Sequence, residues 1–218
     1  KVLKYLNAKK KGILVSTKTG QSNLKEALRL RKEIKDSYIF IDNTFNLSSL
    51  EDFSDIDIWI NNLFMNNVNS FGISLMKIIT DIFSPTSLSI ISLGFIIYFI
   101  IKSKWRMAII SFLSIGGGLF IGAFIKEIVM RARPLNALIF ETDFSFPSGH
   151  AIMVTVFFTL FIYFISPRIK ELYKREVLIL ISILFIIITC VSRLYLGVHW
   201  FSDVVAGSAF GLFWTTLI

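Results

Sequence analysis

Five long apolar runs fill most of the second half of this 218-residue chain, and they limit what it can fold into. A membrane-spanning helix needs about 20 mainly apolar residues, within a range of about 17–25. The chain meets or approaches that requirement at approximately residues 86–101, 106–129, 149–166, 177–196 and 203–218. The runs predict an all-α membrane protein, a bundle of about five transmembrane helices.

The composition agrees with a membrane protein and excludes several other classes. Hydrophobic residues make up 54% of the chain and charged residues only 17%, whereas soluble domains average about 45–50% and about 25%. A disordered protein, a coiled coil and a typical cytosolic enzyme are therefore excluded. The net charge of +8 first suggests basic loops that anchor the chain at the cytoplasmic face, and no nucleic acid is expected as a partner.

The chain divides into three segments by composition. Residues 1–57 are polar and basic and are expected to form a soluble segment with a short α/β pattern. That pattern consists of a predicted helix at residues 24–35 and predicted strands at 12–16, 38–41 and 56–60. Residues 58–85 carry apolar side chains at helical spacing among Asn and Ser, which predicts an amphipathic helix at the membrane interface. Residues 86–218 form the predicted transmembrane domain.

Basic residues in the connections predict the orientation of the bundle. Lys and Arg gather at residues 102–106 and 168–175, two connections that lie on the same side if the spans alternate. The positive-inside rule places that side in the cytoplasm. Residues 130–148 and 197–202 are therefore expected outside the cell membrane. Five spans would also place residues 1–57 outside, although no signal peptide is apparent in them.

The chain has only two histidines, and each stands in a polar cluster at the end of an apolar run. His150 follows Pro147, Ser148 and Gly149 at the start of a predicted helix. The free backbone N–H groups of such a helix start bind anions, phosphate especially. An ordinary capped helix start is the alternative interpretation.

The second histidine, His199, precedes Asp203 by four residues, which is about one helical turn. A carboxylate at that spacing can accept a hydrogen bond from one ring nitrogen and leave the other nitrogen basic and nucleophilic. A paired surface histidine would show the same spacing. Arg193 lies upstream at membrane depth, where an arginine is a functional candidate unless it snorkels to the interface.

A third cluster supplies further cations. Lys126 and Arg133 are seven residues apart, so on a helix both would point into one pocket, and Pro134 is expected to end that helix. Arg131 lies off this face and is interpreted as a flanking residue. With Arg193, the cluster predicts a phosphate-handling site, because Arg binds phosphate oxygens in bidentate fashion. No pair of carboxylates accompanies these cations, so no Mg²⁺ site is expected.

These residues together resemble the three signature motifs of the type-2 phosphatidic acid phosphatase family. The motifs are Lys126 with Arg133 and Pro134, then Pro147-Ser148-Gly149-His150, then Ser192 and Arg193 with His199 and Asp203. Their order, spacing and identities match over about residues 57–218. The resemblance implies a bundle, usually of six spanning helices in membrane members, with the site at its extracytoplasmic end.

The resemblance also implies individual roles. His199 would be the nucleophile that forms a phosphohistidine, oriented by Asp203, and His150 would be the general acid that protonates the leaving group. The phosphoryl oxygens would be held by Lys126, Arg133, Ser148, Gly149 and Arg193. No metal and no cofactor are implied.

The leading interpretation is therefore an integral membrane lipid phosphatase or diphosphatase. Its expected partners are membrane lipids and a lipid phosphate substrate: phosphatidate, phosphatidylglycerol phosphate or a polyprenyl diphosphate such as undecaprenyl diphosphate. A metal site on the two histidines and Asp203 is disfavoured, because adjacent cations would repel a metal. A transport or scaffold protein with a decayed site is a further alternative. The related vanadate-dependent haloperoxidases are disfavoured because this chain is membrane-embedded.

Two further patterns complete the sequence. The spacings Gly118-x-x-x-Gly122 and Gly207-x-x-x-Gly211 allow close helix packing, within the chain or in a homodimer. Residues 11–60 weakly resemble part of the last domain of the diphthamide-synthesis enzymes, which bind an iron–sulfur cluster through cysteines. This chain lacks the corresponding cysteine, so the stretch is interpreted as a fused fragment.

Overall fold

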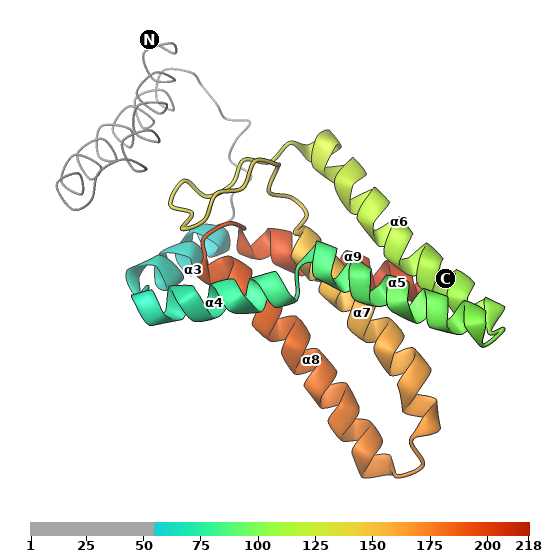
Figure 1. Ribbon diagram of the computed structural model, residues 1–218. Helices are drawn as coiled ribbons and strands as arrows, with labels where there is room; N and C mark the ends of the chain where they lie inside the picture. The colour runs from blue at the N-terminus through green and yellow to red at the C-terminus, as the bar shows by residue number, and fades with distance from the viewer. Residues whose placement is uncertain (1–54) are drawn as a thin grey trace, which may run out of the picture. The chain divides into compact units, whose positions relative to one another are not determined.

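The computed structural model describes residues 55–218, and the structural statements below refer to them. This part of the chain is helical throughout, with helices numbered as in Figure 1. The helices are α3 (Asp55–Asn66), α4 (Ser70–Ile82), α5 (Pro85–Ile101), α6 (Trp105–Val129), α7 (Gly149–Ile165), α8 (Leu172–Tyr195) and α9 (Phe201–Leu217), with a short 3₁₀ turn, Ser166–Arg168, after α7. The all-α fold predicted from the apolar runs is confirmed.

The described residues hold four helical stretches that are long and apolar enough to cross a membrane, so the chain is a multi-pass membrane protein. They are Ser70–Ile101, Trp105–Val129, Gly149–Arg168 and Leu172–Tyr195. The first joins α4 and α5, although the sequence assigned the residues before Pro85 to an interfacial segment. The fifth apolar run becomes α9, which has 17 residues and lies at the lower limit for a span.

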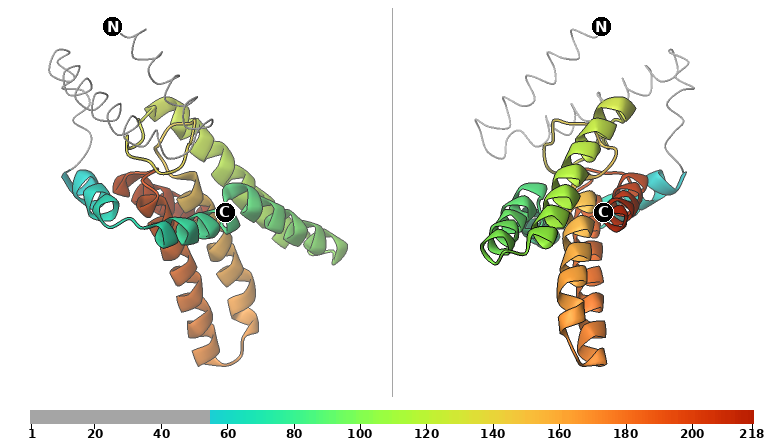
Figure 2. Two further views of the ribbon diagram at one scale, coloured as in Figure 1. Left: turned by 60° about the vertical axis from the view of Figure 1, so that its left-hand side comes forward. Right: turned by 90° about the vertical axis from the view of Figure 1, so that its right-hand side faces the viewer.

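The central helix of the bundle is α7, which packs against α5, α6, α8 and α9. Figure 2 shows α7 and α8 side by side in both views. The α7 side chains Ile152, Met153 and Val156 are fully buried and form a core with Leu88 of α5 and Ile115 of α6. Because α7 contacts four helices, its first residues are placed where several helix ends meet.

Two glycines allow α9 to approach the backbone of α7. A Cβ added at Gly207 would lie 2.7 Å from the Ser148 carbonyl oxygen, and one at Gly211 would lie 2.7 Å from that of Ile152. The Gly207-x-x-x-Gly211 spacing is thus used for packing within the chain. The same contact brings the Ser148 N–H to the Asp203 carbonyl oxygen at 3.1 Å, which holds the start of α7 beside the start of α9.

One predicted strand is wrong. Residues 56–60 are rich in isoleucine, which favours a strand, but they lie in α3. A helix places Ile60 and Phe64 on one face, where they pack against Leu194 and Val204, and it buries Asp57. Tertiary contacts therefore decide the structure here rather than local β propensity. The other elements predicted for the first segment lie outside the described residues.

Candidate active site

A cavity of about 280 Å³ lies where the end of α6, the start of α7 and the turn after α8 meet. Six of the eight site residues predicted from the sequence line it: Lys126, Arg133, Gly149, His150, Arg193 and His199. The other two, Ser148 and Asp203, are completely buried. Residues 130–148, the yellow loop in Figure 1, supply the remaining wall. The structure thus brings the three predicted clusters together.

His199 is buried against Asp203. The Nδ1 atom of His199 lies 3.5 Å from the Asp203 Oδ2 atom, which is longer than a normal hydrogen bond. The same Asp203 oxygen accepts hydrogen bonds from the Trp200 N–H at 2.8 Å and from the Ser145 hydroxyl. These donors fix the carboxylate beneath the imidazole ring. The other ring nitrogen, Nε2, lies 3.2 Å from Nη1 of Arg133, and both residues line the cavity.

The charge state of His199 follows from its surroundings. Burial and the charges of Arg193 and Arg133 together lower the pKa of His199 to about 4, and Asp203 opposes them. The ring is therefore neutral at pH 7, and one of its two nitrogens carries a lone pair.

Lys126 and Arg133 share a carboxylate that the sequence analysis did not single out. Asp143 accepts a hydrogen bond from the Lys126 ammonium and another, at 2.6 Å, from Nη2 of Arg133. Burial alone would raise the pKa of Asp143, but the hydrogen bonds and charges of the two cations lower it to about 2. Asp143 is thus ionised at neutral pH, and half of its side chain is exposed.

Arg193, at the end of α8, has a similar counterion. Its side chain is 2% exposed, donates to Thr80 Oγ1 at 2.8 Å and pairs with Glu141 at 2.6 Å. Its Nε atom is buried without a hydrogen-bond partner. An unpartnered guanidinium N–H beside a cavity is a donor that a bound anion can satisfy.

Arg131 belongs to the site, contrary to its interpretation as a flanking residue. One guanidinium nitrogen bonds Asp203 Oδ1 and the Ser202 hydroxyl, and the other pairs with Asp57 at 2.8 Å. Asp57 in turn accepts the Ser202 N–H at 2.8 Å. Both oxygens of the Asp203 carboxylate, which faces His199, therefore accept hydrogen bonds.

The reason for the difference lies in the end of α6. The helix stops at Val129, and Met130 adopts a left-handed conformation with φ of 50°, four residues before the break expected at Pro134. Arg131 and Arg133 therefore follow loop geometry. Lys126 and Arg133 therefore do not share a helical face as predicted, although the shared carboxylate of Asp143 brings their side chains together.

The cavity at the membrane end of this multi-pass helical protein is lined by both histidines and three paired cations. Few classes of membrane protein combine these features. The family described as the PAP2 superfamily matches residues 107–218, just over half of the chain, and the chain belongs to this superfamily. The matched range contains every site residue that the sequence predicted. The family resemblance is thereby confirmed, whereas the comparisons do not support the resemblance of residues 11–60 to diphthamide-synthesis enzymes.

Two curated relatives match about half of the chain. Phosphatidylglycerophosphatase B of Bacillus subtilis (strain 168) is 31% identical over 116 residues, which cover 52% of this chain and 57% of that protein. An undecaprenyl-diphosphatase of Sulfolobus acidocaldarius is 28% identical over 119 residues, covering 51% and 53%. The chain thus spans little more than half the length of these relatives.

Two crystal structures share the fold. The transmembrane PAP2 type phosphatidylglycerolphosphate phosphatase from Bacillus subtilis has a TM-score of 0.64 at 26% identity, covering 74% of this chain and 81% of that one. Aquifex aeolicus LpxE has a TM-score of 0.59 at 20% identity, covering 77% and 96%. At that lower identity the second likeness supports the fold alone.

Proposed function

We propose that this protein is an integral membrane phosphatase that hydrolyses lipid phosphate monoesters or diphosphates through a phosphohistidine on His199. One observation carries the proposal. A single cavity of about 280 Å³ is lined by both histidines and by three cations, with Asp203 directly behind His199. The superfamily and its phosphatase relatives support the same chemistry.

In the first step, the lone pair on Nε2 of His199 attacks phosphorus while the bond from phosphorus to the leaving oxygen breaks. The ring gains positive charge as the nitrogen–phosphorus bond forms, and Asp203 stabilises that charge. His150 donates a proton to the leaving oxygen, and the negative charge of the substrate favours the protonated form of His150. In the second step, water attacks the phosphohistidine, loses a proton to His150 and releases phosphate and neutral His199.

The cations stabilise the transferring phosphoryl group. Lys126, Arg133 and Arg193 surround the cavity, and the first turn of α7, with Ser148 and Gly149, adds backbone N–H groups. Such groups bind the equatorial oxygens most strongly when charge spreads over them in the transition state. The substrate replaces the Asp143 and Glu141 carboxylates as the partner of these cations.

The substrate class follows from the position of the site at the membrane end of the bundle. Phosphatidylglycerol phosphate and a polyprenyl diphosphate such as undecaprenyl diphosphate are the leading candidates, since the two curated relatives carry phosphatidylglycerophosphatase and undecaprenyl-diphosphatase names. Phosphatidate is the third. We place the site on the extracytoplasmic side of the cell membrane from the basic connections at residues 102–106 and 168–175.

Phosphate release from a panel of these lipids, measured with the purified protein in detergent, tests the proposal. We expect turnover of at least one lipid phosphate, inhibition by vanadate and no loss in EDTA. His199→Asn should abolish both turnover and the acid-labile phosphoenzyme. No release from any lipid by a folded protein would favour a scaffold with a decayed site. Loss in EDTA with recovery in Mg²⁺ would favour a metal enzyme.

His150→Asn separates the two histidine roles. Loss of the proton donor should lower turnover about 10²–10⁴-fold. The loss should be larger for phosphate monoesters, in which the leaving group is a lipid alkoxide. A diphosphate lipid leaves as a phosphate monoester, a better leaving group, and should lose less. A phosphoenzyme that persists in His199→Asn would instead assign the nucleophile to His150.

A further inference from the structure

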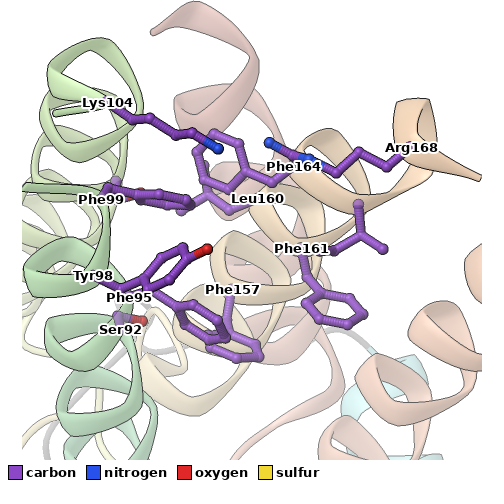
Figure 3. A pocket seen from close by; sticks show the side chains of 12 residues that line it. Ser92, Phe95, Tyr98, Phe99, Lys104, Phe157, Leu160, Phe161, Phe164 and Arg168 are labelled. Carbon is purple, nitrogen blue, oxygen red and sulfur yellow. The ribbon is translucent and has the colours of Figure 1, made fainter. Parts of the chain in front are cut away.

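A second cavity, of about 220 Å³, lies at the other end of α7 from the active site. We call it the distal cleft. Six aromatic side chains line it: Phe95, Tyr98 and Phe99 of α5, and Phe157, Phe161 and Phe164 of α7. Lys104 and Arg168 close one end, and Figure 3 shows their charged groups pointing toward one another above Phe99 and Phe164.

We propose that the distal cleft binds an anionic phospholipid of the adjoining leaflet, with its phosphate between Lys104 and Arg168 and one acyl chain along the aromatic wall. This site is separate from the active site and does not depend on the proposed phosphatase activity. It would be a ligand site in which no bond is made or broken.

The two cations are available to a ligand. In the described part of the chain, Lys126, Arg131, Arg133 and Arg193 are each paired with a carboxylate. Neither Lys104 nor Arg168 takes part in an ion pair there; the Arg168 guanidinium donates to the Met107 sulfur at 3.7 Å. Two exposed cations that face one gap favour a phosphate, because Lys and Arg both donate to phosphate oxygens.

The aromatic wall has the depth of one leaflet. Eleven residues separate Phe157 from Arg168, which is about 17 Å along the helix. Half of the hydrocarbon core is about 15 Å thick. An acyl chain whose headgroup lies at Arg168 would therefore reach Phe157 near the middle of the membrane.

The wall is ordered by its own packing and is open to lipid on one side. The Phe99 and Phe164 rings meet edge to face with centroids 5.0 Å apart, and both side chains are buried. Phe95 packs against Phe157 at 6.5 Å, yet 42% of Phe95 and 49% of Tyr98 remain exposed. A lipid chain can thus enter sideways without moving the buried rings.

The distal cleft and the active site face opposite sides of the membrane. His150 and Arg168 are 18 residues apart along α7 and its 3₁₀ turn, or about 27 Å. That separation is close to the thickness of the hydrocarbon core, about 30 Å. With the active site on the extracytoplasmic side, the distal cleft opens to the cytoplasmic leaflet.

Native mass spectrometry of the purified chain tests this site with phosphatidylglycerol and phosphatidylcholine of identical acyl chains. We expect one phosphatidylglycerol to remain bound and phosphatidylcholine to bind much more weakly. The variant Lys104→Gln with Arg168→Gln should weaken phosphatidylglycerol binding about 25-fold, because each cation near an anionic lipid contributes about a fivefold factor. Millimolar inorganic phosphate should not displace the lipid, since it lacks the chain.

A matched control removes the same charge at the same end of the bundle. Lys170 and Arg175 are exposed and do not line the distal cleft. Lys170→Gln with Arg175→Gln should leave binding unchanged. Equal loss in the two double variants would overturn the proposal in favour of general attraction to a basic surface.

A second pair of variants tests the apolar wall. Tyr98→Ala removes an exposed aromatic ring from the distal cleft, and Phe112→Ala removes one from α6 outside it. Only Tyr98→Ala should weaken the retention of phosphatidylglycerol. Equal retention of the two lipids, or displacement by phosphate alone, would also contradict the proposed occupant.

Discussion

In the proposed mechanism, the protonation state of the His199 imidazole decides whether its ring can act as the nucleophile. Burial and the charges of Arg193 and Arg133 lower its pKa to about 4, against the pull of Asp203. The chain has only two histidines, so ¹⁵N-histidine NMR spectra in detergent are simple. We expect the His199 ring to remain neutral from pH 8 to pH 5 and to protonate only near pH 4.

The assignment is made by comparison with His199→Asn, which removes one set of ring signals. Protonation of His199 near pH 6.5, the ordinary value for histidine, would mean that the ring is solvated and that the buried position is wrong.

Arg131 is expected to act as a positioning residue through Asp203. Its guanidinium joins Asp203 to Asp57, and a hydrogen bond to a charged group contributes about 1.5–3 kcal/mol. Arg131→Gln should therefore lower kcat roughly 10–100-fold with little change in KM, because Arg131 does not line the cavity. Arg131→Lys should recover part of the loss.

Arg106→Gln, on an exposed arginine at the other end of α6, is the control for lost charge. If Arg131→Gln raised KM and left kcat unchanged, Arg131 would bind substrate directly and would not orient the Asp203–His199 pair.

Sequence reasoning found the residues of the signature motifs but not those that hold them. Asp143, Glu141 and Arg131 lie in the loop after α6, where no helical period relates one residue to the next. Asp57 lies in α3, and its partner Ser202 is 145 residues away in the chain. Such contacts depend on how the helix ends converge, which local patterns do not encode.

The approach of α9 to α7 sets the geometry of the site at the scale of helices. Gly207→Val would place a side chain against the backbone of Ser148, and overpacking of this kind costs about 1–3 kcal/mol. We expect a lower thermal midpoint in detergent and loss of activity, since the Ser148–Asp203 contact would also separate. A Cβ added at Gly116 would have no neighbour within 4 Å. Gly116→Ala should therefore raise the thermal midpoint slightly, because alanine has a higher helix propensity than glycine.

If Gly207→Val kept both its midpoint and its activity, the close packing of α7 and α9 would not be needed to align Asp203 with His199.

The helices themselves were predictable, because apolar runs of this length allow few alternatives. The strand predicted at residues 56–60 was wrong because the β propensity of a short isoleucine-rich run cannot outweigh the burial of Asp57 and the packing of Ile60 and Phe64 on one helical face.

The orientation of the whole molecule is open to a labelling experiment. Ala137 is exposed in the loop near the active site, and Lys170 is exposed after α7. In a Cys190→Ser background, Ala137→Cys should react with an impermeant thiol reagent on intact cells, and Lys170→Cys should react only after permeabilisation. The opposite pattern would reverse the proposed orientation.

Residues 1–54 precede α3 and contain none of the proposed site residues. We propose that they are a separate segment, and we predict that their removal leaves phosphatase activity in detergent within a few-fold of the intact chain. Asp57 must be retained, because it contacts Arg131 and Ser202. Complete loss of activity in a truncated protein that still folds would contradict this division.

The carboxylates that already neutralise the site cations have a consequence for selectivity among lipids. In the proposed mechanism, an incoming headgroup exchanges with Asp143, which bridges Lys126 and Arg133, and with Glu141 on Arg193. A phosphodiester carries one negative charge. That is less negative charge than the Asp143 and Glu141 carboxylates already place beside these cations. A phosphomonoester or diphosphate carries about two charges and several free oxygens. We therefore expect abundant membrane phospholipids to be poor competitors, because the resting ion pairs would disfavour occupation of the site by the surrounding bilayer.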